Sequence, residues 1–279
     1  MNAKTRATIE DDQAIEYIEA IALRRLGLFF SEDQKPAIRK RLLEAGRRLN
    51  LPPAALLRRL NTDSAWACGL LADVLSTNHT SFFREPTVLR RISTDILSSL
   101  DAGRQARIWS AAASTGQEAY SVAILLAETV GAKAARERFA ILGTDLVRRV
   151  VTVAEQGRYG PADITNVDLE RRARWFHQHS SQVYEVNDAI KDLCTFRTLN
   201  LVAPKWPFSR KFSVILCRNV LYYLQSQTQK QILERIYEVC APGGWLLTSV
   251  SESIQDLSTP WLTLEPGVHR KLEGRKGSV

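Results

Sequence analysis

The stretch Arg107–Ser121, RIWSAAASTGQEAYS, decides the fold because it changes from a buried strand to a helix within a few residues. Ile108 to Ala113 carries no charged side chain, so it can be buried on both faces, as a strand inside a parallel sheet must be. Ser114-Thr115-Gly116 then ends the strand. The glycine is the only residue of this turn that is free to take a positive φ, and either hydroxyl side chain can cap the following helix. We therefore expect a turn that opens its backbone N–H groups to a ligand.

The turn favours one kind of ligand. In dinucleotide-binding folds the same place holds G-x-G-x-x-G, whose glycines let a pyrophosphate approach the backbone. Here the turn has one glycine, and Glu118 sits where its charge would repel a phosphate. A cofactor with an amine and no phosphate fits better, which indicates S-adenosylmethionine. Taken alone, such a turn is also a common way to start a helix, so the remaining chain must support this interpretation.

The chain downstream predicts an α/β sheet. Further strands are expected at Phe139–Asp145, Phe212–Cys217 and Trp245–Val250, with a helix from about Thr228 to Val239 before the last strand. Asp145 ends the second strand at about the distance where Rossmann-like folds place the carboxylate that binds ribose hydroxyls. Strands that alternate with helices form a parallel sheet covered on both faces, with the ligand at the carboxyl ends of the strands.

The connection between the second and third strands is unusually long, from about residue 148 to 210. It contains two stretches of alternating polarity, Val183–Val186 and Thr195–Leu199, which predict a small antiparallel insertion. His177 and His179 form an H-x-H pair in this region, but nothing nearby completes a metal shell, and we expect no metal site.

Composition limits the protein class. The 279 residues carry no apolar run that could span a bilayer, and the first twelve residues are too polar for a secretory signal, so we expect a cytoplasmic protein. The four cysteines are scattered, which favours buried free thiols over disulfides. The formal charge of +8 indicates an acidic partner, either a nucleic acid or an acidic protein surface.

Much of the positive charge lies in the first third of the chain, where helical periodicity predicts a small helical bundle. On a helix from about Glu32 to Leu49, an apolar stripe of Ile38, Leu42, Ala45 and Leu49 leaves Arg39, Lys40 and Arg47 on the outer face. Glu44 is the only acid among six cations between Lys35 and Arg48. A merely solvated helix would usually mix both signs, so we interpret this face as a docking surface.

Four stretches together resemble the chemotaxis receptor glutamate methyltransferases, the CheR family: Thr77–Glu85, Trp109–Glu118, Cys217–Val220 with Tyr223, and Ser251–Ser253. The similarity covers nearly the whole chain. It implies an all-α N-terminal domain (residues 1–76), a linker that closes over the cofactor (77–105) and a Rossmann-like class I methyltransferase domain (106–279). The small antiparallel β insertion would then occupy about 175–199.

The resemblance also implies an activity and a set of site residues. The enzyme would transfer a methyl group from S-adenosylmethionine to glutamate side chains in receptor cytoplasmic helices, leaving S-adenosylhomocysteine, and we expect a monomer. Arg84 and Tyr223 match catalytic positions of the family. The positions that match cofactor contacts are Asn78, Thr80, Arg84, Glu118, Asp145, Asn200, Leu201, Arg218 and Asn219. Arg39, Lys40 and Arg47 would contact the receptor.

One departure from the family is informative. Many members carry a loop of the G-x-G-x-x-x-G type in the β insertion, associated with binding a pentapeptide tether at the receptor C-terminus. The corresponding stretch here, Trp175–Tyr184, contains no glycine. This resembles the pentapeptide-independent class. Two alternatives stay open: a non-catalytic scaffold that senses the cofactor, and a nucleic-acid methyltransferase. The second would need an acceptor-activating motif such as D/N-P-P-Y/F or a catalytic Cys beside Pro, and Arg218–Leu221 is neither.

Overall fold

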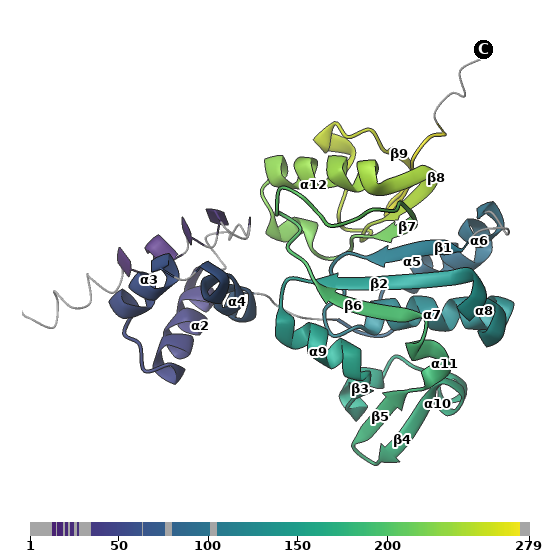
Figure 1. The fold of residues 1–279 in the computed structure, drawn as a ribbon, viewed down its shortest axis with the longest axis horizontal. Coiled ribbons are helices and arrows are strands. Elements are labelled where there is room, and N and C mark those ends of the chain that lie inside the picture. Colours follow the sequence, from purple (N-terminus) through teal and green to yellow (C-terminus); the bar gives the residue numbers. More distant parts are fainter. Residues whose placement is uncertain are drawn as a thin grey trace, which may run out of the picture. The chain divides into compact units, whose positions relative to one another are not determined.

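The computed structural model describes residues 35–62, 64–75, 80–100 and 105–273, together with scattered residues between 13 and 27 (Figure 1). The chain divides into two compact units. The first comprises residues 1–77 and 223–228, and the second comprises residues 78–222 and 229–279.

The first unit is helical, as expected. Its main helices are α2 (Lys35–Arg48), α3 (Pro53–Thr62) and α4 (Ser64–Leu75). Leu51 and Pro52 lie in the loop between α2 and α3, and Pro53 begins α3. Ile38, Leu42 and Ala45 are buried as expected, but Leu49 is 39% exposed. The helix ends one residue before Leu49, and Gly46 occupies the buried position instead.

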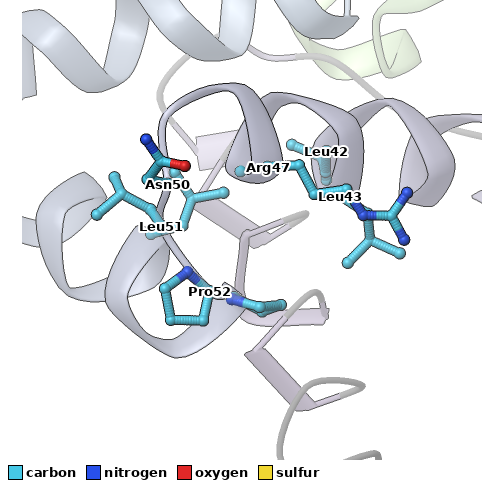
Figure 2. A pocket seen from close by; sticks show the side chains of 9 residues that line it. Leu42, Leu43, Arg47, Asn50, Leu51 and Pro52 are labelled. Atoms are coloured by element: carbon cyan, nitrogen blue, oxygen red, sulfur yellow. The ribbon is translucent and has the colours of Figure 1, made fainter.

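A hollow of about 390 Å³ lies where the end of α2 meets the following loop and the start of α3. Figure 2 shows the side chains of Leu42, Leu43 and Leu51 around it, with Arg47 and Asn50 beside them. The first unit therefore presents apolar surface next to one of its exposed cations.

The second unit contains a seven-stranded sheet with the order β6-β2-β1-β7-β8-β10-β9. Its strands are β1 (Ala106–Ser110), β2 (Phe139–Asp145), β6 (Cys194–Thr198), β7 (Phe212–Leu216), β8 (Cys240–Leu247), β9 (Leu262–Glu265) and β10 (Val268–Arg270). The first five strands in this order pair in parallel, and β10 pairs antiparallel with both β8 and β9. The predicted α/β class is confirmed.

The order of the strands reverses next to β1, whose neighbours are β2 on one side and β7 on the other. In an open parallel sheet such a switch point creates a crevice at the carboxyl ends of the strands, where ligands bind. The segments that follow β1 and β7 begin with Ala111 and Cys217. Residues of these two segments should therefore line the functional site.

Helices connect the strands. They are α7 (Gln117–Val130), α8 (Ala132–Arg138), α9 (Arg148–Gln156), α10 (Leu169–Trp175), α11 (Asp188–Lys191) and α12 (Ser226–Val239), with short 3₁₀ turns η2 (Pro161–Ile164), η3 (Leu221–Tyr223) and η4 (Gln255–Leu257). A further helical segment precedes β1, and its middle is a π-helical turn. It runs as α5 (Pro86–Arg91), η1 (Ile92–Ile96) and α6 (Leu97–Ser99).

The antiparallel insertion is a three-stranded sheet with the order β3-β5-β4, formed by β3 (Arg158–Tyr159), β4 (Phe176–Ser180) and β5 (Val183–Val186). Val183–Val186 was correctly predicted. The second predicted stretch, Thr195–Leu199, was assigned wrongly: it belongs to β6, which pairs in parallel with β2 at the edge of the main sheet. An edge strand with one solvent-facing side alternates in polarity just as an antiparallel strand does, so the pattern could not separate the two.

The strand expected at Trp245–Val250 begins earlier, at Cys240, and ends at Leu247. The register between β7 and β8 shifts between Phe212 and Val214, which accommodates Pro242-Gly243-Gly244 within the strand. Gly244 is required there, because a Cβ atom would lie 2.6 Å from Cys240 Sγ. None of the described helices has both the length and the apolar character that a membrane crossing requires.

His269 on β10 supports the end of β8 from within the core. Its Nε2 lies 3.1 Å from Thr248 Oγ1, and its Nδ1 lies 3.0 Å from Thr263 Oγ1. The Thr248 hydroxyl in turn donates to the Glu252 carbonyl (3.2 Å). A neutral ring with its proton on Nε2 satisfies this chain of bonds. Burial lowers the pKa of His269 to about 4, which keeps the ring neutral.

His269 should make stability depend on pH between about 6.5 and 4. In this window the unfolded chain binds a proton at His269 and the folded chain does not, so stability falls as pH decreases. The shift to a pKa of about 4 corresponds to about 3 kcal/mol. Urea unfolding at several pH values should show a shallower decline for His269→Gln than for the native chain. Equal slopes would assign the acid sensitivity to other groups.

Candidate active site

The turn after β1 is held by the carboxylate at the end of β2. Asp145 accepts hydrogen bonds from the backbone N–H of Ser114 (Oδ2, 2.9 Å) and of Val147 (Oδ1, 3.0 Å). Each carboxylate oxygen retains a further lone pair. Burial raises the pKa of Asp145, while the backbone N–H groups of Val147, Ser114 and Leu146 oppose this rise. Asp145 therefore holds the turn after β1 in place, a role that the sequence did not predict.

The conformation of this turn differs from our expectation in two respects. Gly116 has a positive φ of 97°, as predicted, but Ser114 also takes a positive φ of 50°. Gly116 itself is the N-cap of α7, which has no side-chain cap, and Thr115 Oγ1 bonds to Gln117 instead. Anchoring of the Ser114 N–H by Asp145 explains how a non-glycine residue is held in this region.

Gly116 is required for packing as well as for its φ. A Cβ atom there would lie 2.9 Å from Ala154 Cβ and 3.1 Å from Tyr159 Oη. The Tyr159 hydroxyl donates to the Thr115 carbonyl at 2.7 Å. Helix α9 and strand β3 thus pack against the turn and fix its position.

The predicted pair Asn200–Leu201 lies beside Asp145. It follows β6, and the Leu199 N–H donates to the Asp145 carbonyl at 2.9 Å. The Asn200 side chain accepts from the Val202 N–H (3.0 Å), and Leu201 is buried. The structure therefore brings three of the predicted cofactor residues to the ends of β2 and β6.

Arg218 crosses the switch point between β1 and β7. Its side chain is 1% exposed, and Nη1 donates to Glu118 Oε2 at 2.9 Å. Nη2 donates to the Arg84 carbonyl at 2.7 Å and lies 3.4 Å from Glu85 Oε2. The other Glu118 oxygen accepts from Ser110 Oγ at 2.7 Å. One buried guanidinium therefore joins the end of β1, the start of α7 and the segment before α5.

Glu85 is a site residue to which the sequence assigned no role. Its Oε1 accepts from Ser249 Oγ (2.8 Å) and from Asn219 Nδ2 (3.1 Å), and its Oε2 accepts from the Val250 N–H (3.1 Å). Burial would raise the pKa of Glu85, but bonds from Ser249, Asn219 and Val250 and the Arg218 charge hold it below its ordinary value. Glu85 is therefore an anion that positions the predicted contact Asn219.

Glu252 is a second residue without an assigned role. Its carboxylate accepts from the backbone N–H groups of Asn219 (2.7 Å), Leu221 (2.8 Å) and Ser249 (3.2 Å). Burial raises the pKa of Glu252, and these bonds offset the rise in part. Both acids lie inside motifs that the sequence singled out, yet only their convergence on Asn219, which has a φ of 57°, shows what they do.

The segment that carries Arg84 is fixed on both sides. The fully buried Phe82 packs edge-on against Tyr159 and Phe176, with ring centroids 5.0 and 5.3 Å apart. The Phe83 N–H donates to Ser121 Oγ at 2.8 Å, and the Arg171 guanidinium lies 4.3 Å from the Phe83 ring centroid. Phe83 and Glu85 both have a positive φ, of 53° and 51°. Arg84 is therefore presented between two left-handed residues.

The remaining predicted residues are placed as follows. Thr80 is half-buried at the start of this segment, and Asn78 lies outside the described residues. Tyr223 ends η3 and belongs to the first unit, so its role stays a prediction. His179 bonds to Glu185 within the insertion (2.9 Å).

The residues present fit S-adenosylmethionine. Ser114 Oγ and Arg218 Nε are buried and have no hydrogen-bond partner among the described residues, so polar capacity remains beside the turn. If the cofactor binds here as the sequence predicts, Glu118 would face its amino group, and Asp145 would accept from its ribose hydroxyls. A switch point with these groups beside it and no phosphate-binding glycines in its turn is typical of an S-adenosylmethionine-dependent methyltransferase.

Comparison with known proteins specifies the family. Residues 78–267 match the CheR methyltransferase, SAM binding domain. A probable chemotaxis protein methyltransferase of Rhizobium etli is 33% identical over 237 residues, covering 82% of this chain and 88% of that protein. The chemotaxis protein methyltransferase of Escherichia coli is 28% identical, covering 88% of this chain and 86% of that protein. The chain belongs to the CheR methyltransferase family, and its reaction is S-adenosylmethionine-dependent methylation in chemotaxis.

Replacing Asp145 should weaken cofactor binding. In Asp145→Ala the ribose hydroxyls lose a charged acceptor, at a cost of roughly 1.5–3 kcal/mol per bond, and the Ser114 N–H loses its anchor. Asp145→Asn keeps one oxygen and should fall between the alanine variant and the native chain. Calorimetry with S-adenosylhomocysteine measures this order.

The matched control is Asp192→Asn, which alters a carboxylate in a surface ion pair with Arg136. Its affinity should equal that of the native chain. Native affinity in a folded Asp145→Ala protein would remove this residue from the cofactor site.

Proposed function

We propose that the protein forms methyl esters on glutamate side chains in the cytoplasmic helices of chemotaxis receptors. The observation that carries this proposal is that Arg218 unites Glu118, Glu85 and the Arg84 segment at the switch point of a CheR-family domain. A non-catalytic scaffold would have no need to hold Arg84 between two left-handed residues.

The chemistry agrees with these residue types. A glutamate with an ordinary pKa near 4.3 is already a carboxylate at neutral pH, so the acceptor needs no general base. When bound, S-adenosylmethionine supplies a methyl group on a sulfonium. Transfer of this methyl to the carboxylate oxygen would leave the electron pair of the broken bond on sulfur, and it would require no proton transfer by the protein.

The protein then contributes alignment and exclusion of water. The two opposite charges cancel in the transition state, so a dry site accelerates the step, and alignment supplies several kcal/mol more. Arg84 would orient the acceptor carboxylate through its planar guanidinium. Tyr223, at the family's active-site tyrosine position, would lie near the acceptor glutamate. A strong ion pair with Arg84 would make the acceptor carboxylate a weaker nucleophile. We therefore propose that Arg84 orients the carboxylate and does not activate it.

The direct test is transfer of tritiated methyl from S-adenosylmethionine to receptor-bearing membranes. Methyl esters release the label as methanol in mild base, whereas N-methyl groups do not. Base-labile label on receptor supports the proposal. Stable label, or label on nucleic acid, would contradict it, and binding of the cofactor without any transfer would indicate the scaffold.

Arg84→Ala should lower the turnover number by about 100-fold or more, because an aligned ionic contact to the acceptor is lost. Arg84→Lys should recover only part of this loss, since an ammonium lacks the planar fork. Methyl-transfer rates are compared with the folded fraction from circular dichroism. The control is Arg90→Ala, an exposed arginine on α5. Activity that falls only in proportion to folded protein would make Arg84 structural.

We propose further that the receptor docks on α2. Lys40 and Arg47 are exposed there, Arg39 is half-buried, and the first turn of the helix holds no acid. The hollow beside Arg47 adds apolar surface (Figure 2). The receptor helices that carry the acceptor glutamates would be acidic and would complement the positive charge of α2. Because the β insertion lacks the glycine loop, α2 would supply more of the binding free energy for the receptor.

Replacing Arg39, Lys40 and Arg47 together by Glu should abolish receptor methylation and leave affinity for S-adenosylhomocysteine unchanged. Surface charges act mainly on association rate and weaken with salt. Native methylation should therefore fall steeply with ionic strength, and low salt should not recover methylation in the triple variant.

A double variant, Lys40→Glu with Arg47→Glu, limits the change to exposed side chains. An excess of the pentapeptide tether should neither bind the protein nor compete. Full activity of the triple variant would contradict the docking face, and micromolar binding of the tether would contradict tether independence.

A further inference from the structure

Two large apolar side chains are exposed next to the cofactor-site network. Tyr222 and Val250 are each 50% exposed, and they lie on the segments that follow two neighbouring strands, β7 and β8. We propose that Tyr222 and Val250 form an apolar contact that binds the substrate helix on either side of its acceptor glutamate. This inference rests on the proposed function and names how the same site selects its substrate.

The two residues are tied to the same carboxylates as Asn219. The Val250 N–H donates to Glu85 Oε2 at 3.1 Å, while Asn219 Nδ2 donates to the other oxygen of Glu85. The Tyr222 N–H lies 3.4 Å from Glu252 Oε1, while the Asn219 N–H donates to the other oxygen of Glu252. Val250 and Asn219 therefore share the Glu85 carboxylate, and Tyr222 and Asn219 share the Glu252 carboxylate.

Glu252, on the segment after β8, joins the two segments, because it accepts from the Asn219 and Leu221 N–H groups after β7. Ser249 ties the same segment to Glu85, since its hydroxyl donates to Glu85 at 2.8 Å, and its N–H donates to Glu252 at 3.2 Å. Glu252 consequently binds backbone from the segment after β7 and from the segment after β8. The two segments lie side by side, and both are fixed by hydrogen bonds before any substrate arrives.

The exposure of these side chains is not a consequence of loose structure. Ser249 and Glu252 on either side of Val250 are buried, as is Leu221 before Tyr222, so the backbone is anchored while these two side chains face outward. Side chains that are held in place lose little freedom on binding, which favours their use in recognition. Tyrosine in particular is enriched among the residues that dominate binding energy.

The chemistry of the occupant follows from the acceptor. On an α-helix, the residues three and four positions from a glutamate lie on the same face as that glutamate. Apolar side chains at those positions would meet Tyr222 and Val250 when the carboxylate reaches the methyl group. This contact is uncharged, so its contribution should persist at salt concentrations that screen the basic face of α2.

The test measures methyl-transfer kinetics for Tyr222→Ala and Val250→Ala with a receptor cytoplasmic fragment. The KM for receptor should rise about fivefold to tenfold in each variant, at both low and high salt. The turnover number and the affinity for S-adenosylhomocysteine should remain within about twofold of the native values. Leu264→Ala, which truncates a 47% exposed leucine on β9, is the matched control and should change nothing.

A receptor variant tests the contact from the other side. Replacing the apolar residues three and four positions from the acceptor by Ser should raise KM for the native enzyme, with a much smaller effect in the Tyr222→Ala enzyme. Native transfer with unchanged receptor KM in both enzyme variants would overturn this inference alone. Absence of transfer by the native enzyme would instead overturn the proposed function, and this inference with it.

Discussion

The site depends on one buried positive charge. The Arg218 guanidinium is almost fully enclosed and contacts two carboxylates, Glu118 and Glu85, and the carbonyl of Arg84. A buried charge is tolerated only where partners compensate it, and removal of a partner from such a pair costs about 3–5 kcal/mol. The segments that supply these partners are therefore held together, although they are far apart in the sequence.

This charge links the fold to the reaction. The strand order places the ends of β1 and β7 at a switch point, and Arg218 spans it to the first turn of α7. On the other side it fixes the segment that presents Arg84 beside the ends of β7 and β8. The second carboxylate, Glu252, then fixes Asn219 and the segment after β8. The proposed cofactor contacts and the residue proposed to orient the acceptor consequently share one hydrogen-bonded network.

Much of this arrangement could be predicted from the sequence, because burial and periodicity are local signals. Phe139–Asp145 and Val183–Val186 form strands with the predicted bounds. The prediction that Thr195–Leu199 belongs to the antiparallel insertion was wrong, because an edge strand of the main sheet and a strand of the insertion show the same alternation of polarity. The roles of Glu85 and Glu252 could not be predicted, since they depend on which backbone N–H groups the fold brings to each carboxylate, and no local pattern contains that information.

The most direct measurement of the central claim is amide hydrogen exchange at Phe83 and Val250 in the native protein and in Arg218→Met. If Arg218 holds the segments together, both amides are protected in the native protein and exchange much faster in the folded variant, and S-adenosylhomocysteine does not restore protection in the variant. Arg91→Met, which alters a surface ion pair with Asp95, should leave both amides protected. Unchanged protection in a folded Arg218→Met protein would contradict the account.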